Sequence, residues 1–159
     1  HTDENVKVVG IAGDSGFVSI NTTKYLMNRE VGFGRKLLQI LEDLNISWDH
    51  MPTGIDDLSV ILRSKELTPI KEQEILKHLI QDLQVDYAEI EHDLSIIMIV
   101  GENMKNQIGV TATATKALSE NNINIQMISQ GSSEVSIMFV VNQEQEKQAI
   151  KALYDVFFK

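Results

Sequence analysis

The 159 residues contain no cysteine, two prolines and one tryptophan, and acidic residues outnumber basic ones by 23 to 14. Without cysteine there is no disulfide frame and a reducing compartment is allowed, so we expect a cytoplasmic protein. The net charge of −9 opposes binding to nucleic acid or to an anionic membrane, because both depend on Lys and Arg. No apolar run approaches the roughly 20 residues that span a bilayer, and residues 1–5 lack the apolar core of a signal peptide. The chain does not begin with Met, so we expect it to be a piece of a longer one.

An internal repeat is present at a fixed offset of 77 residues. Without any gap, the offset aligns Gly32 with Gly109, Leu41 with Leu118, Asn45 with Asn122, Ile46 with Ile123 and Gly54 with Gly131. Solenoid repeats are shorter, so this spacing predicts two copies of a small domain.

Hydrophobic periodicity predicts the elements of each copy. In the first copy we expect strands at 17–23, 46–53, 58–63 and 85–92, a helix at 33–44, and a second helix that Thr68 caps and Pro69 opens. In the second copy we expect strands at 94–100, 123–129 and 135–141 and helices at 109–120 and 143–157. The second copy therefore lacks its last strand, while a spare strand, residues 6–12, precedes the first copy. We predict an α+β fold of two ferredoxin-like βαββαβ modules, with the first module (residues 14–93) inserted in the second (residues 6–13 and 94–159).

Catalytic and metal-binding motifs are weak in this sequence. Gly13-Asp14-Ser15-Gly16 is similar to the segment around a serine-protease nucleophile, but no credible His and Asp partners accompany it, and we interpret it as a turn. Residues 32–36 open a predicted helix as phosphate loops do, yet they lack the Walker spacing. His92 stands between two acids on a predicted strand, where neighbours point to opposite faces, so we expect no metal site.

The junction before Gly32 is the best candidate for a small-ligand site. A helix N-terminus offers free N–H groups and a partial positive charge, which suit a carboxylate. Asp49, on the following predicted strand, is a possible counter-charge for an ammonium group. An amino acid carries both groups. The alternative is that Gly32 is a loop glycine, Asp49 a surface acid and Trp48 a packing residue.

The sequence also resembles a known family. Residues 101–104, 109–110 and 121–134, the last reading Asn-Asn-Ile-Asn-Ile-Gln-Met-Ile-Ser-Gln-Gly-Ser-Ser-Glu, resemble the second regulatory ACT domain of aspartate kinases, and residues 32–34, 37–47 and 59–62 are similar to the first. The resemblance covers nearly the whole chain. It implies the C-terminal regulatory region of an aspartate kinase, in which ACT modules of two chains pair and an end-product amino acid, lysine or threonine, binds at their interface.

Carried onto this chain, the resemblance implies effector-binding residues at Met27, Glu30, Gly32, Phe33, Gly34, Ser47, Trp48, Asp49 and Thr53. The positions from Met27 to Gly34 would lie near the α-groups of the effector, Asp49 would face a side-chain ammonium, and Thr53 would support inhibition. Trp48 stands where a small aliphatic residue is usual, and Gly34 where a bulky apolar residue is common. These departures leave the choice open between lysine, which we favour, and threonine, either alone or together with lysine.

The resemblance implies a parent enzyme that transfers a phosphoryl group from ATP, with Mg, to the side-chain carboxylate of aspartate. The catalytic domain is absent from this sequence, so we expect the fragment to be inactive alone and to hold no cofactor. The expected partners are an amino-acid effector, a second copy that forms a homodimer through the ACT modules, and the catalytic kinase domain of the same or a partner chain. The alternative is a separate small subunit that is needed for assembly and does not itself bind effector.

Overall fold

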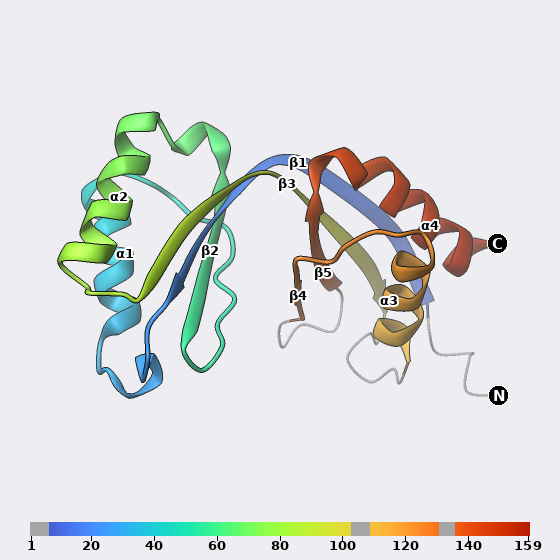
Figure 1. Cartoon of the computed structure of the whole chain (residues 1–159). Helices are drawn as coiled ribbons and strands as arrows, with labels where there is room; N and C mark the ends of the chain where they lie inside the picture. The colour runs from blue at the N-terminus through green and yellow to red at the C-terminus, as the bar shows by residue number, and fades with distance from the viewer. Residues whose placement is uncertain (1–6, 103–108, 131–135) are drawn as a thin grey trace. The chain divides into compact units, whose positions relative to one another are not determined.

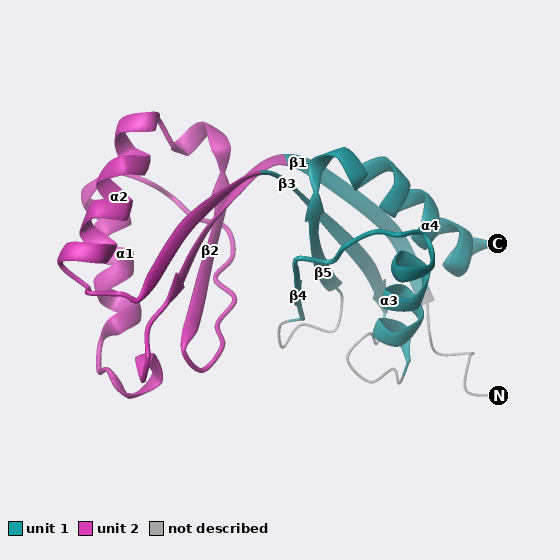
Figure 2. Cartoon of the chain, viewed as in Figure 1, with its two compact units in different colours: residues 1–15, 93–159 teal, residues 16–92 magenta. Residues whose placement is uncertain are grey.

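The computed structural model describes residues 7–102, 109–130 and 136–159, which form two compact units. Unit 1 comprises residues 1–15 and 93–159, and unit 2 comprises residues 16–92 (Figure 2). Two long strands, β1 (Lys7–Thr23) and β3 (Tyr87–Glu102), contribute to both units (Figure 1). The expectation of an α+β fold with antiparallel strand pairs is confirmed.

The sheet of unit 2 has the strand order β2, β1, β3. β2 (Asp57–Arg63) pairs antiparallel with β1, in a register that places Ile20 opposite Val60 and Thr23 opposite Asp57. Helices α1 (Phe33–Asp43) and α2 (Pro69–Gln81) pack on one face of this sheet (Figure 1). The core between them buries alternate residues of each strand and one stripe of each helix, as amphipathic elements require: Val18, Ile20, Phe33, Leu37, Ile40, Leu41, Leu58, Val60, Leu62, Ile75 and Leu79.

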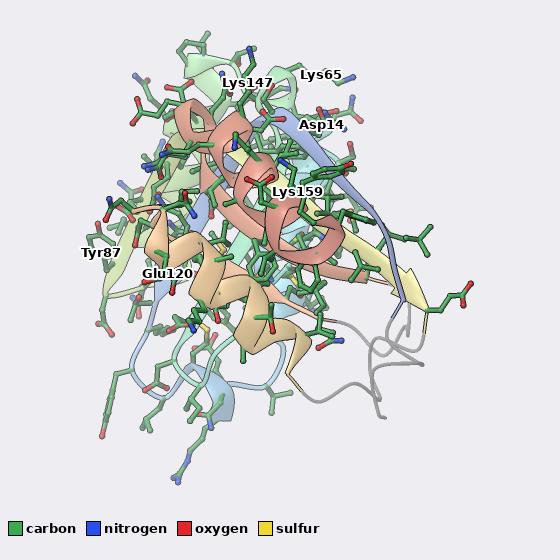
Figure 3. All side chains as sticks on the ribbon, turned by 90° about the vertical axis from the view of Figure 1, so that its right-hand side faces the viewer. Asp14, Lys65, Tyr87, Glu120, Lys147 and Lys159 are labelled. Atoms are coloured by element: carbon green, nitrogen blue, oxygen red, sulfur yellow. The ribbon has the colours of Figure 1, made fainter. Side chains whose placement is uncertain are left out.

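The sheet of unit 1 has the strand order β1, β3, β5, β4. β5 (Ser136–Asn142) pairs antiparallel with β3, with Ile97 opposite Phe139, and with the short β4 (Met127–Ser129). Helices α3 (Val110–Glu120) and α4 (Glu146–Phe158) bury small and apolar residues against this sheet, while charged residues such as Glu120 and Lys147 are exposed on them (Figure 3).

Residues at the 77-residue offset share backbone conformations. Gly32 and Gly109 precede α1 and α3 with φ of +81° and +96°, which a residue without Cβ adopts readily. Asn45 and Asn122 follow the same helices with φ of +57° each. The repeat in sequence therefore corresponds to the same start and stop of a helix in each unit. For α2, the predicted start is also confirmed, because Thr68 Oγ1 accepts from the Lys71 N–H at 3.2 Å and Pro69 opens the helix.

The predicted turn at residues 13–16 is wrong, because β1 runs through this segment without interruption. A Cβ at Gly13 would lie 2.6 Å from Ile150 Cδ1 of α4, so this glycine permits a close approach of helix and strand. The division of residues 85–100 into two strands is also wrong, since β3 continues through Asp93, whose φ is +56°.

The predicted strand at residues 46–53 is not formed as a regular strand. This segment contacts β2 through two isolated bridges, His50 with Ile61 and Thr53 with Leu58. The N–H groups of Asp49 and His50 both donate to the Ile61 carbonyl, at 2.8 and 3.2 Å, which places two residues opposite one as in a β-bulge. Pro52 has no N–H to donate, and it interrupts the ladder a second time.

Candidate functional site

A tight loop connects β1 to α1 in unit 2. It contains a short 3₁₀ turn, Met27–Arg29, in which the Met27 N–H donates to the Lys24 carbonyl at 3.0 Å and the Glu30 N–H donates to the Met27 carbonyl at 3.1 Å. Leu26 has a φ of +60°, a strained conformation for a residue with a branched side chain. The loop thus holds a backbone geometry that places Glu30 and Gly32 directly before the helix.

At the N-terminus of α1 the Phe33 N–H donates to the Glu30 carbonyl at 3.3 Å. None of the described side chains caps this end of the helix, and its first turn has no acidic residue. The Phe33 side chain is buried, whereas a Cβ built on Gly34 would meet no atom within 4 Å. The first turn of a helix leaves backbone N–H groups without intrahelical partners, so this end can receive a carboxylate from a ligand.

A cavity of about 230 Å³ lies against this helix end. Its walls are the β1–α1 loop, the start of α1 and the hairpin that leads into β2. Apolar side chains, among them the buried Met27, Phe33 and Leu58, form part of its surface. The described residues that line it are Met27, Asn28, Glu30, Gly32, Phe33, Gly34, Thr53, Gly54, Ile55, Asp57 and Leu58.

The Glu30 carboxylate at this cavity is already neutralised. Lys24 Nζ lies 2.5 Å from one of its oxygens and Lys36 Nζ lies 3.4 Å from the other. The hydrogen bond from Lys24 lowers the pKa of Glu30 most, desolvation raises it, and Lys36 lowers it again, so that the pKa lies below its ordinary value. Glu30 is therefore ionised and paired within the chain.

Asp57 is the second carboxylate in the lining, and its environment is different. Among the described residues, none donates a hydrogen bond to the Asp57 carboxylate and none forms an ion pair with it. The carboxylate lies over Gly54, where an added Cβ would be only 3.0 Å from Asp57 Cγ. Gly54 also donates its N–H to the Asp57 carbonyl at 2.9 Å. The absence of a side chain at Gly54 thus lets an unpaired carboxylate sit at the cavity.

A second cavity, of about 570 Å³, lies at the opposite end of α1. It is lined by Leu38, Leu41, Glu42, Asn45, Ile46, Ser47, Trp48 and Glu66. Ser47 Oγ donates to Glu66 Oε1 at 3.2 Å, and Trp48 is 42% exposed. Because α1 has 11 residues, its two ends are separated by about 16 Å.

The structure consequently divides the residues that the sequence predicts as one site. Met27, Glu30, Gly32, Phe33, Gly34 and Thr53 line the smaller cavity, and Ser47 and Trp48 line the larger one. Asp49 lines neither of these two cavities.

Sequence reasoning missed Asn28, Gly54, Ile55, Asp57 and Leu58 as lining residues. Two adjacent aspartates are typical of a solvated face, so the sequence carries no local signal that marks Asp57 as a lining residue.

Two further properties bear on the kind of site. Across residues 7–102, 109–130 and 136–159, no three His, Asp or Glu side chains gather in a way that fits a metal ion. In the same part of the chain, every helix is too short or too polar to cross a membrane.

Comparison with known proteins identifies the family. Residues 97–157 match the ACT domain family. The chain is 52% identical to aspartokinase 3 of Bacillus subtilis (strain 168), over 97% of this chain and 34% of that protein. The crystal structure of Clostridium acetobutylicum aspartate kinase superposes with a TM-score of 0.88 at 36% identity, covering 94% of this chain and 34% of that one. A structure of aspartokinase alpha and beta subunits superposes with a TM-score of 0.81 at 26% identity, covering 94% and 98%.

The chain spans about a third or less of the length of the curated relatives that it matches first. Its resemblance to aspartate kinases, stated above from residues 101–134 and 32–62, is confirmed by these matches. The chain therefore belongs to the aspartokinase family, as a piece of its ACT-containing regulatory part.

Proposed function

We propose that this chain is the amino-acid-binding regulatory region of an aspartate kinase and mediates feedback inhibition, with lysine as the effector and threonine as the second candidate. The observation that carries the proposal is the cavity at the N-terminus of α1. Its volume of about 230 Å³ lies below the range of about 300–1,000 Å³ that is typical of drug-sized ligands, and it suits a single amino acid.

The lining of the cavity matches lysine in three parts. The end of α1 beside Gly32 and Gly34 receives the α-carboxylate. Met27, Phe33 and Leu58 offer an apolar wall for an aliphatic chain. Asp57, the unpaired carboxylate, pairs with the side-chain ammonium. Threonine has neither a long aliphatic chain nor a second cation, so it would leave the Asp57 carboxylate without a partner.

One solved structure with the same fold was determined in complex with lysine. E. coli aspartokinase III, in a structure with lysine and aspartate in the T-state, superposes on this chain with a TM-score of 0.78 at 23% identity. In that protein the ligands belong to a longer chain, of which this sequence covers 34%.

Ser47, Trp48 and Asp49 belong, in this proposal, to a surface that faces a second copy of the chain. The bulge at Asp49 and His50 leaves this sheet edge irregular, and Trp48 is half-exposed beside the larger cavity. A homodimer built on this edge would bring Asp49 toward the effector of the neighbouring copy. Within one chain Asp57 is the carboxylate of the cavity that Lys24 and Lys36 do not pair, so Asp49 and Asp57 make separable contributions to lysine binding.

We also propose that units 2 and 1 are the first and second ACT modules, with the first inserted in the second. The continuous stretch of unit 2 and the divided sequence of unit 1 support this arrangement. The catalytic kinase domain, with ATP and Mg, belongs to the parent enzyme. A phosphotransfer assay on this chain alone should therefore give no turnover, and measurable turnover would contradict the proposal.

The direct test is isothermal titration of the chain with L-lysine and with L-threonine. We expect saturable binding of lysine and weaker or undetectable binding of threonine. Gly34→Val adds a side chain at a residue that lines the cavity and should weaken lysine binding, and Thr111→Val, at the equivalent position of α3 in unit 1, is the matched control that leaves this cavity intact. Absence of binding with both amino acids would overturn the proposal.

A second candidate function is a separate subunit for assembly that binds no effector. The observation in its favour is size, because the chain covers 98% of a chain in the structure of aspartokinase alpha and beta subunits. Gel filtration with a catalytic partner chain tests it. Co-elution together with no heat from either amino acid would favour this second function.

A further inference from the structure

Lys24 lies where the walls of the smaller cavity meet. Its Nζ donates to Glu30 Oε1 at 2.5 Å and to the Leu83 carbonyl at 2.7 Å, and it lies 5.7 Å from the centre of the Phe33 ring. The side chain is 21% exposed. One ammonium group thus connects the β1–α1 loop, the start of α1 and the segment that follows α2.

The backbone of Lys24 connects the remaining wall. Its N–H donates to the Asp56 carbonyl at 2.9 Å, and its carbonyl accepts from the Met27 N–H at 3.0 Å. The hairpin that carries Gly54 and Asp57 is therefore fixed to the same residue as the loop. A substitution of Lys24 therefore changes a residue that contacts every wall of the cavity.

The charge of Lys24 matters because of Glu30. Glu30 precedes α1 by three residues, and a carboxylate near a helix N-terminus is stabilised by the partial positive charge there. An unpaired Glu30 would compete with the carboxylate of a ligand for this end of the helix and would repel it. Lys36 is a weaker partner for Glu30, since its Nζ is at 3.4 Å and its side chain is 44% exposed.

We propose that Lys24 is a positioning residue for the amino-acid site: it holds Glu30 in an ion pair and so keeps the N-terminus of α1 available for the carboxylate of the effector. The proposal rests on the proposed function and adds to it a residue outside the cavity lining. It also assigns Glu30 a role different from direct contact with the effector, because both of its oxygens are engaged by lysines.

The test is a set of four variants titrated with L-lysine: Lys24→Met, Glu30→Gln, Lys24→Met with Glu30→Gln, and Lys36→Met as the matched control. We expect Lys24→Met to weaken binding about tenfold or more, since it leaves Glu30 with only its weaker partner, Lys36, at a partly solvated site. Lys36→Met should stay within about threefold of the unchanged protein, and Glu30→Gln should lose less affinity than Lys24→Met, because it leaves no competing carboxylate at the helix end. The double variant should recover most of the lost affinity, because it removes the competing charge.

Recovery in the double variant distinguishes the charge effect from simple loss of an anchor. If the double variant binds as weakly as Lys24→Met, Lys24 acts only as a structural tether and the proposal is wrong. Unchanged affinity in Lys24→Met would also overturn it. If Lys24→Met does not fold in a thermal melt, Lys24→Gln takes its place in both single and double variants. Failure of the unchanged protein to bind lysine or threonine would instead refute the proposed function, and this inference with it.

Discussion

Replacement of Asp57 by Asn tests the assignment of the cavity most directly. The substitution keeps the size of the side chain and removes its charge. Two unit charges 4 Å apart attract by about 1 kcal/mol in water and about 4 kcal/mol at the effective dielectric of a protein surface. Asp57 is exposed at the edge of the cavity, so we expect a loss of about 2 kcal/mol, or about 30-fold in the dissociation constant of lysine.

The assay is isothermal titration with two ligands. L-Norleucine has the aliphatic chain of lysine without the terminal ammonium, so its affinity should be the same for the Asp57→Asn variant and the unchanged protein. If Asp57→Asn lowers the affinity for lysine and for norleucine equally, the pairing of Asp57 with the side-chain ammonium is refuted. Asp49→Asn is the companion variant. If it abolishes lysine binding while Asp57→Asn has no effect, the acid that recognises the ammonium comes from the bulged edge and not from the cavity of a single chain.

Three further predictions concern stability. Gly32→Ala should destabilise unit 2 by about 1–2 kcal/mol in urea unfolding, because φ is +81° at this position; unchanged stability would mean that the helix start rearranges easily. Thr68→Ala should lower the free energy of unfolding by about 1 kcal/mol in the same measurement, because it removes the N-cap of α2, and Thr68→Ser should retain the N-cap and the stability. Because the pKa of Glu30 is lowered on folding, its ion pairs stabilise the protein above the ordinary glutamate pKa of about 4.3, and this contribution disappears as the pH falls through the lowered value. The free energies of urea unfolding of the unchanged protein and of Glu30→Gln should therefore differ at pH 7 and converge as the pH falls through the lowered pKa, whereas a constant difference would contradict this reasoning.

The helices and the fold class could be predicted from sequence because their signals are local. Apolar spacing and glycine at the helix ends were sufficient for α1 and α3, and Thr68 with Pro69 for α2. The path of β1 could not be predicted in the same way. Gly13 has the composition of a turn, and only the close packing of Ile150 from a distant helix explains a glycine within a strand.

The lining of the smaller cavity, the candidate site, could be predicted where it depends on the helix end and not where it depends on contacts distant in sequence. Gly32 and Gly34 indicated the junction that lines the smaller cavity. Asp57 was missed because two adjacent aspartates are typical of a solvated face, and nothing local indicates that one of them lies over a glycine. The regular strand expected at residues 46–53 placed Asp49 beside the junction, and the bulge opposite Ile61 alters that geometry.

The shared strands also set an order of events on the ribosome. Residues 16–92 are contiguous, so unit 2 has all of its sequence as soon as its last strand segment has emerged. The first strand segment of unit 1, in contrast, is synthesised early and must remain unpaired until residues 93–159 follow. Translation therefore completes unit 2 first and leaves the strand edge of residues 7–15 unpaired until unit 1 is complete, and an unpaired edge is prone to aggregation.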